Sequence, residues 1–201
     1  MARSNEPIFA RSLMILGAFL VISLSGIPGE ALGDQDWYVS LYGARLTGDT
    51  LGDTVRLDAS YENSYFFVLS AGRKLFQIKD LMKFEAEVQV AKHFGEQHNW
   101  EFNGLVILRW VKFPWNNFLK TSFAVGDGLS YATEPPEVEE RHHDDTSRLL
   151  DYLMFEVSAS LPDDSRWEVF TRIHHRSGAF GLFNGVTGAS NAIGLGIRYH
   201  F

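Results

Sequence analysis

The chain contains no cysteine among its 201 residues. Disulfide frameworks, thiol nucleophiles and zinc sites with cysteine ligands are therefore excluded. Basic residues are also in the minority, with 18 Lys and Arg against 25 Asp and Glu. The resulting net charge of −7 disfavours nucleic acid as a partner, because surfaces that bind nucleic acid are basic.

The sequence also lacks the run of roughly 20 apolar residues that a membrane-spanning helix requires. The uncharged segment 13–22 follows Arg3 and Arg11 and precedes the small residues of Ala31-Leu32-Gly33. This arrangement predicts a secretory signal peptide over residues 1–33, cleaved near Gly33, with an N-terminal membrane anchor as the alternative. The predicted leader holds as many acidic as basic residues, so the mature chain keeps the net charge of −7. A mature chain of this kind enters a membrane only as a closed sheet.

The rest of the chain, residues 34–201, alternates apolar and polar residues in segments typical of β-strands. Within 82–94, for example, Phe84 and Val88 alternate with Glu85 and Glu87. Each segment therefore has one apolar and one polar face. The expected strands are 36–46, 65–76, 82–94, 97–110, 119–132, 147–161, 165–177 and 190–201.

Strand lengths near ten residues, aromatic residues at strand ends and alternating short and long connections are typical of a small transmembrane barrel. We therefore expect an all-β fold: an eight-stranded antiparallel up-and-down transmembrane β-barrel. A soluble lipocalin-like barrel explains the same alternation if its apolar face points inward. The last segment ends in Phe201, in phase with Ile197 and Tyr199, which resembles the C-terminal pattern of bacterial outer-membrane barrels. With both termini on the periplasmic side, the long polar segments 47–64 and 133–147 are extracellular.

The segment "IHHRSG", residues 173–178, brings a histidine and a serine onto one face of a strand. Residues two apart in a strand project from the same face, so His175 and Ser177 share the face of Trp167, which is the lipid-facing one. His174 points to the barrel interior by the same rule. Polar groups facing hydrocarbon are costly, and this pair suggests nucleophilic catalysis, in which the imidazole accepts the proton of the serine hydroxyl.

A third group that orients the histidine is expected on the last strand, which runs antiparallel beside this one. Counting back from Phe201 in steps of two places Asn191 on the lipid-facing side. Ser190 has the opposite orientation and is the weaker candidate. An asparagine can hold an imidazole by a hydrogen bond but supplies no negative charge.

The His-x-Ser strand end, the glycine-rich segment "GAFGLFNGVTG" and the aromatic C-terminal strand together resemble the lipid A 3-O-deacylase (PagL-like) family of outer-membrane acyl hydrolases. The resemblance implies that His175 is the general base and Ser177 the nucleophile. It also implies oxyanion donors from the backbone amides of Gly178 and Ala179, with the side chain of Asn184 as a further donor. The chain departs from the family pattern at Gly178, where the family has an asparagine, and at Asn191, where it has a glutamate.

The substrate that the resemblance implies is lipid A of lipopolysaccharide in the outer leaflet, and the chemistry requires no cofactor. We expect Arg176 to meet the phosphate groups of this glycolipid, and Arg172 to point into the interior. The alternative function is a catalytically weak or inactive barrel with a structural or adhesion role. The sequence leaves open whether the chain forms a homodimer.

Other polar clusters have simpler interpretations. The "ERHHDD" segment, residues 140–145, offers metal-ligand types but is more typical of a solvated loop. His93 and His98 flank an expected extracellular turn and are predicted at the surface. Inward-facing charges are expected to pair within a filled barrel, which disfavours a porin. These are Glu85, Glu87, Arg109 and Glu156.

Overall fold

The computed structural model describes residues 36–136, 146–183, 185–186 and 188–201. The predicted signal peptide 1–33, the charged segment 140–145 and Asn184 lie outside these ranges. The described residues form a closed barrel of eight strands in the order β1 to β8, each antiparallel to its neighbours. The strands are β1 (Trp37–Thr47), β2 (Tyr61–Ile78), β3 (Met82–Gly95), β4 (Trp100–Trp110), β5 (Lys120–Ala132), β6 (Leu149–Ser160), β7 (Trp167–Ser177) and β8 (Ala189–His200).

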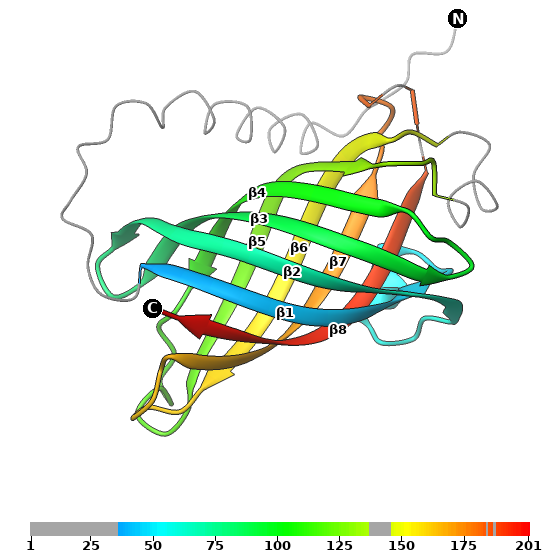
Figure 1. Ribbon diagram of the computed structural model, residues 1–201. Helices are drawn as coiled ribbons and strands as arrows, with labels where there is room; N and C mark the ends of the chain where they lie inside the picture. The colour runs from blue at the N-terminus through cyan, green and yellow to red at the C-terminus, as the bar shows by residue number, and fades with distance from the viewer. Residues whose placement is uncertain (1–35, 137–145, 184, 187) are drawn as a thin grey trace, which may run out of the picture. The chain divides into compact units, whose positions relative to one another are not determined.

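The barrel closes where β8 lies beside β1, with Val39 opposite Tyr199 and Thr47 opposite Asn191 (Figure 1). A short helix, α2 (Leu51–Val55), lies in the connection between β1 and β2. In the described part of the chain, no helix is long and apolar enough to cross a membrane.

The predicted strands are confirmed, and the main difference is at the start of β2. This strand begins at Tyr61, earlier than the expected start at 65. Tyr61 pairs with Thr47 after an irregularity in the register beyond Arg45, and this pairing extends the hairpin. The connection between β1 and β2 is correspondingly shorter and is folded around α2.

A belt of exposed apolar side chains runs around the outward face of the barrel. Exposed large apolar side chains come from every strand, among them Leu41, Leu69, Val88, Leu108, Leu129, Val157, Val169 and Leu195. Aromatic side chains mark the strand ends, including Trp37, Trp110 and Trp167 at the end that carries the C-terminus. This arrangement requires a hydrocarbon environment and excludes the soluble alternative.

The interior is filled by a network of buried ion pairs. Arg172 contacts Glu87 at 2.7 Å and Glu156 at 2.5 Å, and Arg198 contacts Glu156 at 2.8 Å and Glu168 at 2.7 Å. Large buried charges of opposite sign satisfy one another in this way and occupy the space that a pore would need. The predicted polar filling is confirmed.

The two ends of the barrel differ in their connections. One end carries both the start of β1 and the end of β8, together with the connections 79–81, 111–119 and 161–166. The opposite end, called the loop end below, carries the connections 48–60, 96–99, 133–148 and 178–188. His175, Ser177 and Asn191 all lie at the loop end.

Candidate active site on the membrane-facing surface

Strand β7 places His175 and Ser177 on the outward face of the barrel, as the alternation predicts. The buried residues of this strand are the even-numbered ones, Phe170, Arg172, His174 and Arg176, and the odd-numbered ones are partly or fully exposed. His174 points inward and its Nε2 lies 2.9 Å from a carboxylate oxygen of Glu101. The two histidines of "IHHRSG" therefore lie in different environments.

Asn191 contacts His175 across the β7–β8 pair. The two residues are direct register partners, and His175 Nδ1 lies 2.7 Å from Asn191 Oδ1. The Nδ2 group of Asn191 donates to the backbone carbonyl of Asp49 at 2.8 Å. Asp49 lies in the β1–β2 connection, so this connection fixes the orientation of the Asn191 amide.

The orientation of the Asn191 amide sets the proton position on His175. Because Nδ2 faces a carbonyl, which only accepts, the oxygen Oδ1 must face the imidazole. His175 therefore carries its proton on Nδ1 and donates it to Asn191. Its Nε2 is left with a free lone pair, which is the tautomer that a general base for a serine hydroxyl requires.

His175 and Ser177 are neighbours on the outward face of β7. Among the described residues, no hydrogen bond joins the two side chains, which stand two residues apart on the same face of β7. The Oγ of Ser177 accepts a long hydrogen bond from the backbone amide of Ala179, at 3.4 Å. Catalytic hydrogen bonds are often loose without substrate and shorten when it binds.

The chain turns sharply directly after Ser177. Ala179 and Phe180 have positive φ angles of 47° and 59°, which are uncommon for residues with a side chain. Such strained conformations are concentrated at functional sites. The turn aims the Ala179 amide at Ser177, whereas the Gly178 amide donates to the Gly188 carbonyl at 3.1 Å.

The same turn explains why glycine occupies position 178. A Cβ atom at Gly178 would lie 1.9 Å from the carbonyl oxygen of Val186. The asparagine of the resembled family cannot be accommodated here without a shift of the 178–188 connection. Of the predicted oxyanion donors, Ala179 has its amide beside Ser177, Gly178 has its amide engaged elsewhere, and Asn184 lies outside the described residues.

The structure corrects two predicted positions. Arg176, predicted to meet the phosphate groups of the glycolipid, has the same parity as Arg172 and is buried in the barrel, where its Nε donates to Ser130 Oγ at 3.0 Å. Its guanidinium is also held by the backbone carbonyls of the β5–β6 connection, so it does not face a lipid phosphate. His93, expected at the surface, is buried with its Nε2 3.0 Å from Glu101, whereas His98 is exposed as expected.

Two acidic residues near the site escaped the sequence prediction. Asp151 on β6 is the direct register partner of Ser177, and it faces outward. Asp127 on β5 also faces outward. On β5 the register partner of Asp151 is Leu129, so Asp127 lies two residues away from that partner, diagonally from Asp151. Their outward position on apolar strands could have identified them from the sequence, because charged residues are rare on a lipid-facing surface and indicate a functional site there.

The outward side chains around Ser177 thus offer a base, a hydroxyl, an amide and two carboxyl groups. In the described part of the chain, no group of three or more His, Asp or Glu side chains is arranged to hold a metal ion.

Comparison with known proteins supports the fold. No family model and no curated protein sequence matches the chain. The crystal structure of Neisserial surface protein A is similar with a TM-score of 0.53 and 16% identity, covering 85% of this chain and 100% of that one. The crystal structure of the outer membrane enzyme PagL is similar with a TM-score of 0.54 and 12% identity, covering 80% of this chain and 98% of that one. The chain therefore has the fold of small outer-membrane β-barrels, and this fold, together with the apolar belt around it, places the protein in the bacterial outer membrane.

Proposed function

We propose that this protein is an outer-membrane serine esterase that removes the 3-O-linked acyl chain from lipid A of lipopolysaccharide. One observation carries the proposal: Asn191, itself held by the Asp49 carbonyl, accepts a hydrogen bond from His175 Nδ1 at 2.7 Å. This contact leaves Nε2 of His175 unprotonated, which is the state that a general base for a serine hydroxyl requires. An asparagine that merely caps a loop would need no such contact.

The proposed reaction has two steps. Ser177 Oγ attacks the acyl carbonyl while His175 Nε2 takes the hydroxyl proton, and the same imidazole then protonates the departing sugar oxygen. The C–O bond of the substrate ester breaks and an acyl-serine ester remains. Water, deprotonated by His175, then attacks this ester, which releases the fatty acid and restores the serine hydroxyl. The Ala179 amide, already directed at Ser177, is the donor best placed for the developing oxyanion.

The position of the site supports a lipid substrate. His175 and Ser177 face outward at the loop end, which is the extracellular end if both termini are periplasmic. An acyl chain lying along the barrel wall brings its ester carbonyl to the depth of this site. The neighbouring loop exposes Phe180 and Leu182, which suits the edge of a membrane.

The second candidate is a barrel with a structural or adhesion role and no activity. The same fold is found in a surface protein and in an enzyme, so the fold does not decide between these functions. In the part of the chain that the structure describes, no carboxylate contacts His175, and this favours the second candidate, because the imidazolium formed during catalysis gains no ion pair from Asn191.

The deciding experiment incubates the purified barrel, folded in detergent, with lipopolysaccharide and follows lipid A by mass spectrometry. We expect the loss of one hydroxyacyl group, and no loss with the variant Ser177→Ala. Ser165→Ala, at the opposite end of the barrel, is the matched control and should retain the wild-type rate. An unchanged lipid A mass after long incubation with a folded, heat-modifiable wild-type barrel contradicts the proposed activity.

A further inference from the structure

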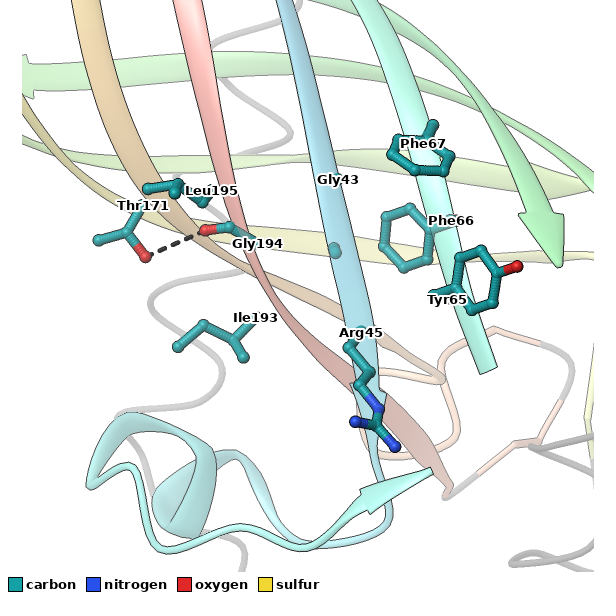
Figure 2. Close-up of a pocket in the computed structure, with 10 residues that line it drawn as sticks. Gly43, Arg45, Tyr65, Phe66, Phe67, Thr171, Ile193, Gly194 and Leu195 are labelled. Carbon is teal, nitrogen blue, oxygen red and sulfur yellow. Dashed lines mark hydrogen bonds between the residues drawn. The ribbon is translucent and has the colours of Figure 1, made fainter. Parts of the chain in front are cut away.

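A groove of about 470 Å³ crosses the outward face of the barrel next to the candidate site (Figure 2). Its floor is Gly43 on β1, which has Phe67 of β2 on one side and Leu195 of β8 on the other as register partners. Because glycine has no side chain, a trough is left between the two exposed apolar residues. This volume is within the range typical of small-molecule sites.

Arg45 lies at the end of the groove nearest the loop end (Figure 2). Its Nε donates to the Glu62 carbonyl at 2.9 Å, and its guanidinium carbon lies 5.4 Å from the centre of the Tyr61 ring. Among the described residues, no carboxylate forms a salt bridge with this exposed guanidinium. A cation at the membrane-facing surface without such a partner suits a lipid phosphate, which a guanidinium can bind through two hydrogen bonds.

The groove adjoins the His175–Asn191 pair. Ile193, which lines the groove, is the next outward residue after Asn191 on β8 and is the register partner of Arg45. Thr171, also in the lining, lies on β7, the strand of His175. Neighbouring strands are about 4.8 Å apart, and Arg45 is offset from the level of His175 by two residues along the strand, so the two residues are separated by roughly 12 Å. One lipid molecule can span this distance.

We propose that this groove holds an acyl chain of the phosphorylated glycolipid substrate, with Arg45 on a phosphate, and so selects which ester reaches Ser177. The inference rests on the proposed function and adds a substrate-binding subsite to it. In this account Arg45 takes the role that the sequence suggested for Arg176. Lipid tails already surround the barrel, so the apolar walls offer an acyl chain no hydrophobic gain and select it by its shape. The guanidinium of Arg45 supplies the charge complementarity to the phosphate.

The test uses two substitutions, each with a matched control elsewhere on the outward face. Gly43→Leu fills the floor, and its only close neighbour is the flexible Phe67 ring, 3.0 Å from the ideal Cβ position. Gly104→Leu is the control, because Gly104 faces outward on β4 with nothing within 4 Å of its Cβ position. Arg45→Gln removes the cation, and Lys92→Gln removes an outward cation on β3 as its control.

Binding is measured by native mass spectrometry of each variant in a Ser177→Ala background, with purified lipid A as the probe. Overpacking the groove with Gly43→Leu should weaken lipid A binding about tenfold, and Gly104→Leu should leave it unchanged. Loss of a charge-assisted contact in Arg45→Gln should weaken binding of phosphorylated lipid A about tenfold or more, but not of dephosphorylated lipid A. Equal binding by Gly43→Leu and Gly104→Leu overturns the groove, and equal loss in Lys92→Gln overturns the role of Arg45.

The same variants with Ser177 intact separate this inference from the proposed function. Gly43→Leu should slow deacylation of lipopolysaccharide about tenfold while hydrolysis of a short-chain p-nitrophenyl ester stays within about twofold. If no ester is cleaved but the binding differences persist, the groove stands and the esterase function falls. If phosphatidylglycerol binds as tightly as lipid A and responds in the same way to both variants, the groove is not selective for the glycolipid, and the proposal is overturned.

Discussion

The substitution Asn191→Leu tests whether the asparagine orients His175, the proposed general base. Leucine has nearly the shape of asparagine but neither accepts from His175 Nδ1 nor donates to the Asp49 carbonyl, contacts of 2.7 Å and 2.8 Å. A neutral hydrogen bond contributes about 0.5–1.5 kcal/mol, which corresponds to a factor of about 2 to 12 in rate for each contact. The loss of both contacts, about 1–3 kcal/mol together, predicts a decrease in kcat of about 5- to 150-fold.

The upper limit follows from the tautomers of the imidazole. An asparagine that forces the wrong tautomer in a serine protease lowers kcat by about 10⁴. With leucine, His175 is free to adopt either tautomer and spends part of its time in the productive one, so the loss stays well below that value. Asn191→Asp also loses the donor to the Asp49 carbonyl, but it keeps an acceptor for Nδ1 and adds a charge that stabilises the imidazolium, so its kcat should exceed that of Asn191→Leu.

The assay is the initial rate of lipopolysaccharide deacylation, measured by mass spectrometry on variants that show the heat-modifiable mobility of a folded barrel. Ser177→Ala sets the background. A folded Asn191→Leu variant with a rate within twofold of the wild type refutes the orienting role of Asn191. A drop of four orders of magnitude refutes the tautomer argument, because free rotation of the ring does not produce so large a loss.

Three further substitutions test the barrel around the site. Glu156→Gln should lower the free energy of unfolding in urea by about 3–5 kcal/mol, because three buried arginines lose the carboxylate that they share. An unchanged unfolding midpoint contradicts this role. Gly72→Ala should destabilise the barrel by about 1–3 kcal/mol in the same assay, since the new Cβ would lie 2.1 Å from Tyr38 Cζ, and full stability shows that the Tyr38 ring has room to move. Asp151→Leu should stabilise the barrel by about 1–2 kcal/mol by removing a lipid-facing carboxyl group, while slowing deacylation because Asp151 faces Ser177. Unchanged deacylation by Asp151→Leu removes this residue from the site.

The sequence predicts the barrel well because strand alternation is a local property. Each strand is recognisable from the alternation of its own residues. The closed sheet then shows that the apolar face points outward, which distinguishes a membrane barrel from a soluble one. The contact between His175 and Asn191 was predictable for the same reason, because parity and antiparallel pairing fix both residues on one face. The error at Arg176 came from a misapplied parity, since this residue is an even number of positions from the inward-facing Arg172.

Beyond the His175–Asn191 pair, features that depend on the register between strands were not predictable. Asp151 becomes a neighbour of Ser177 only through the pairing of β6 with β7, which the length of the 161–166 connection determines. The apolar groove depends on Gly43 lying between Phe67 and Leu195, on strands far apart in the sequence. The engagement of the Gly178 amide depends on the conformation of the 178–188 connection, and glycine-rich connections have no simple pattern that predicts it.

Labelling with a fluorophosphonate is the most direct test of the claim that Ser177 is a nucleophile activated by His175. This reagent modifies serine hydroxyl groups that a neighbouring base activates. Peptide mass spectrometry of the labelled, folded barrel should find the adduct on Ser177, and the adduct should be absent in His175→Ala. A folded wild-type barrel that carries no adduct on Ser177, or one labelled equally with and without His175, contradicts the account.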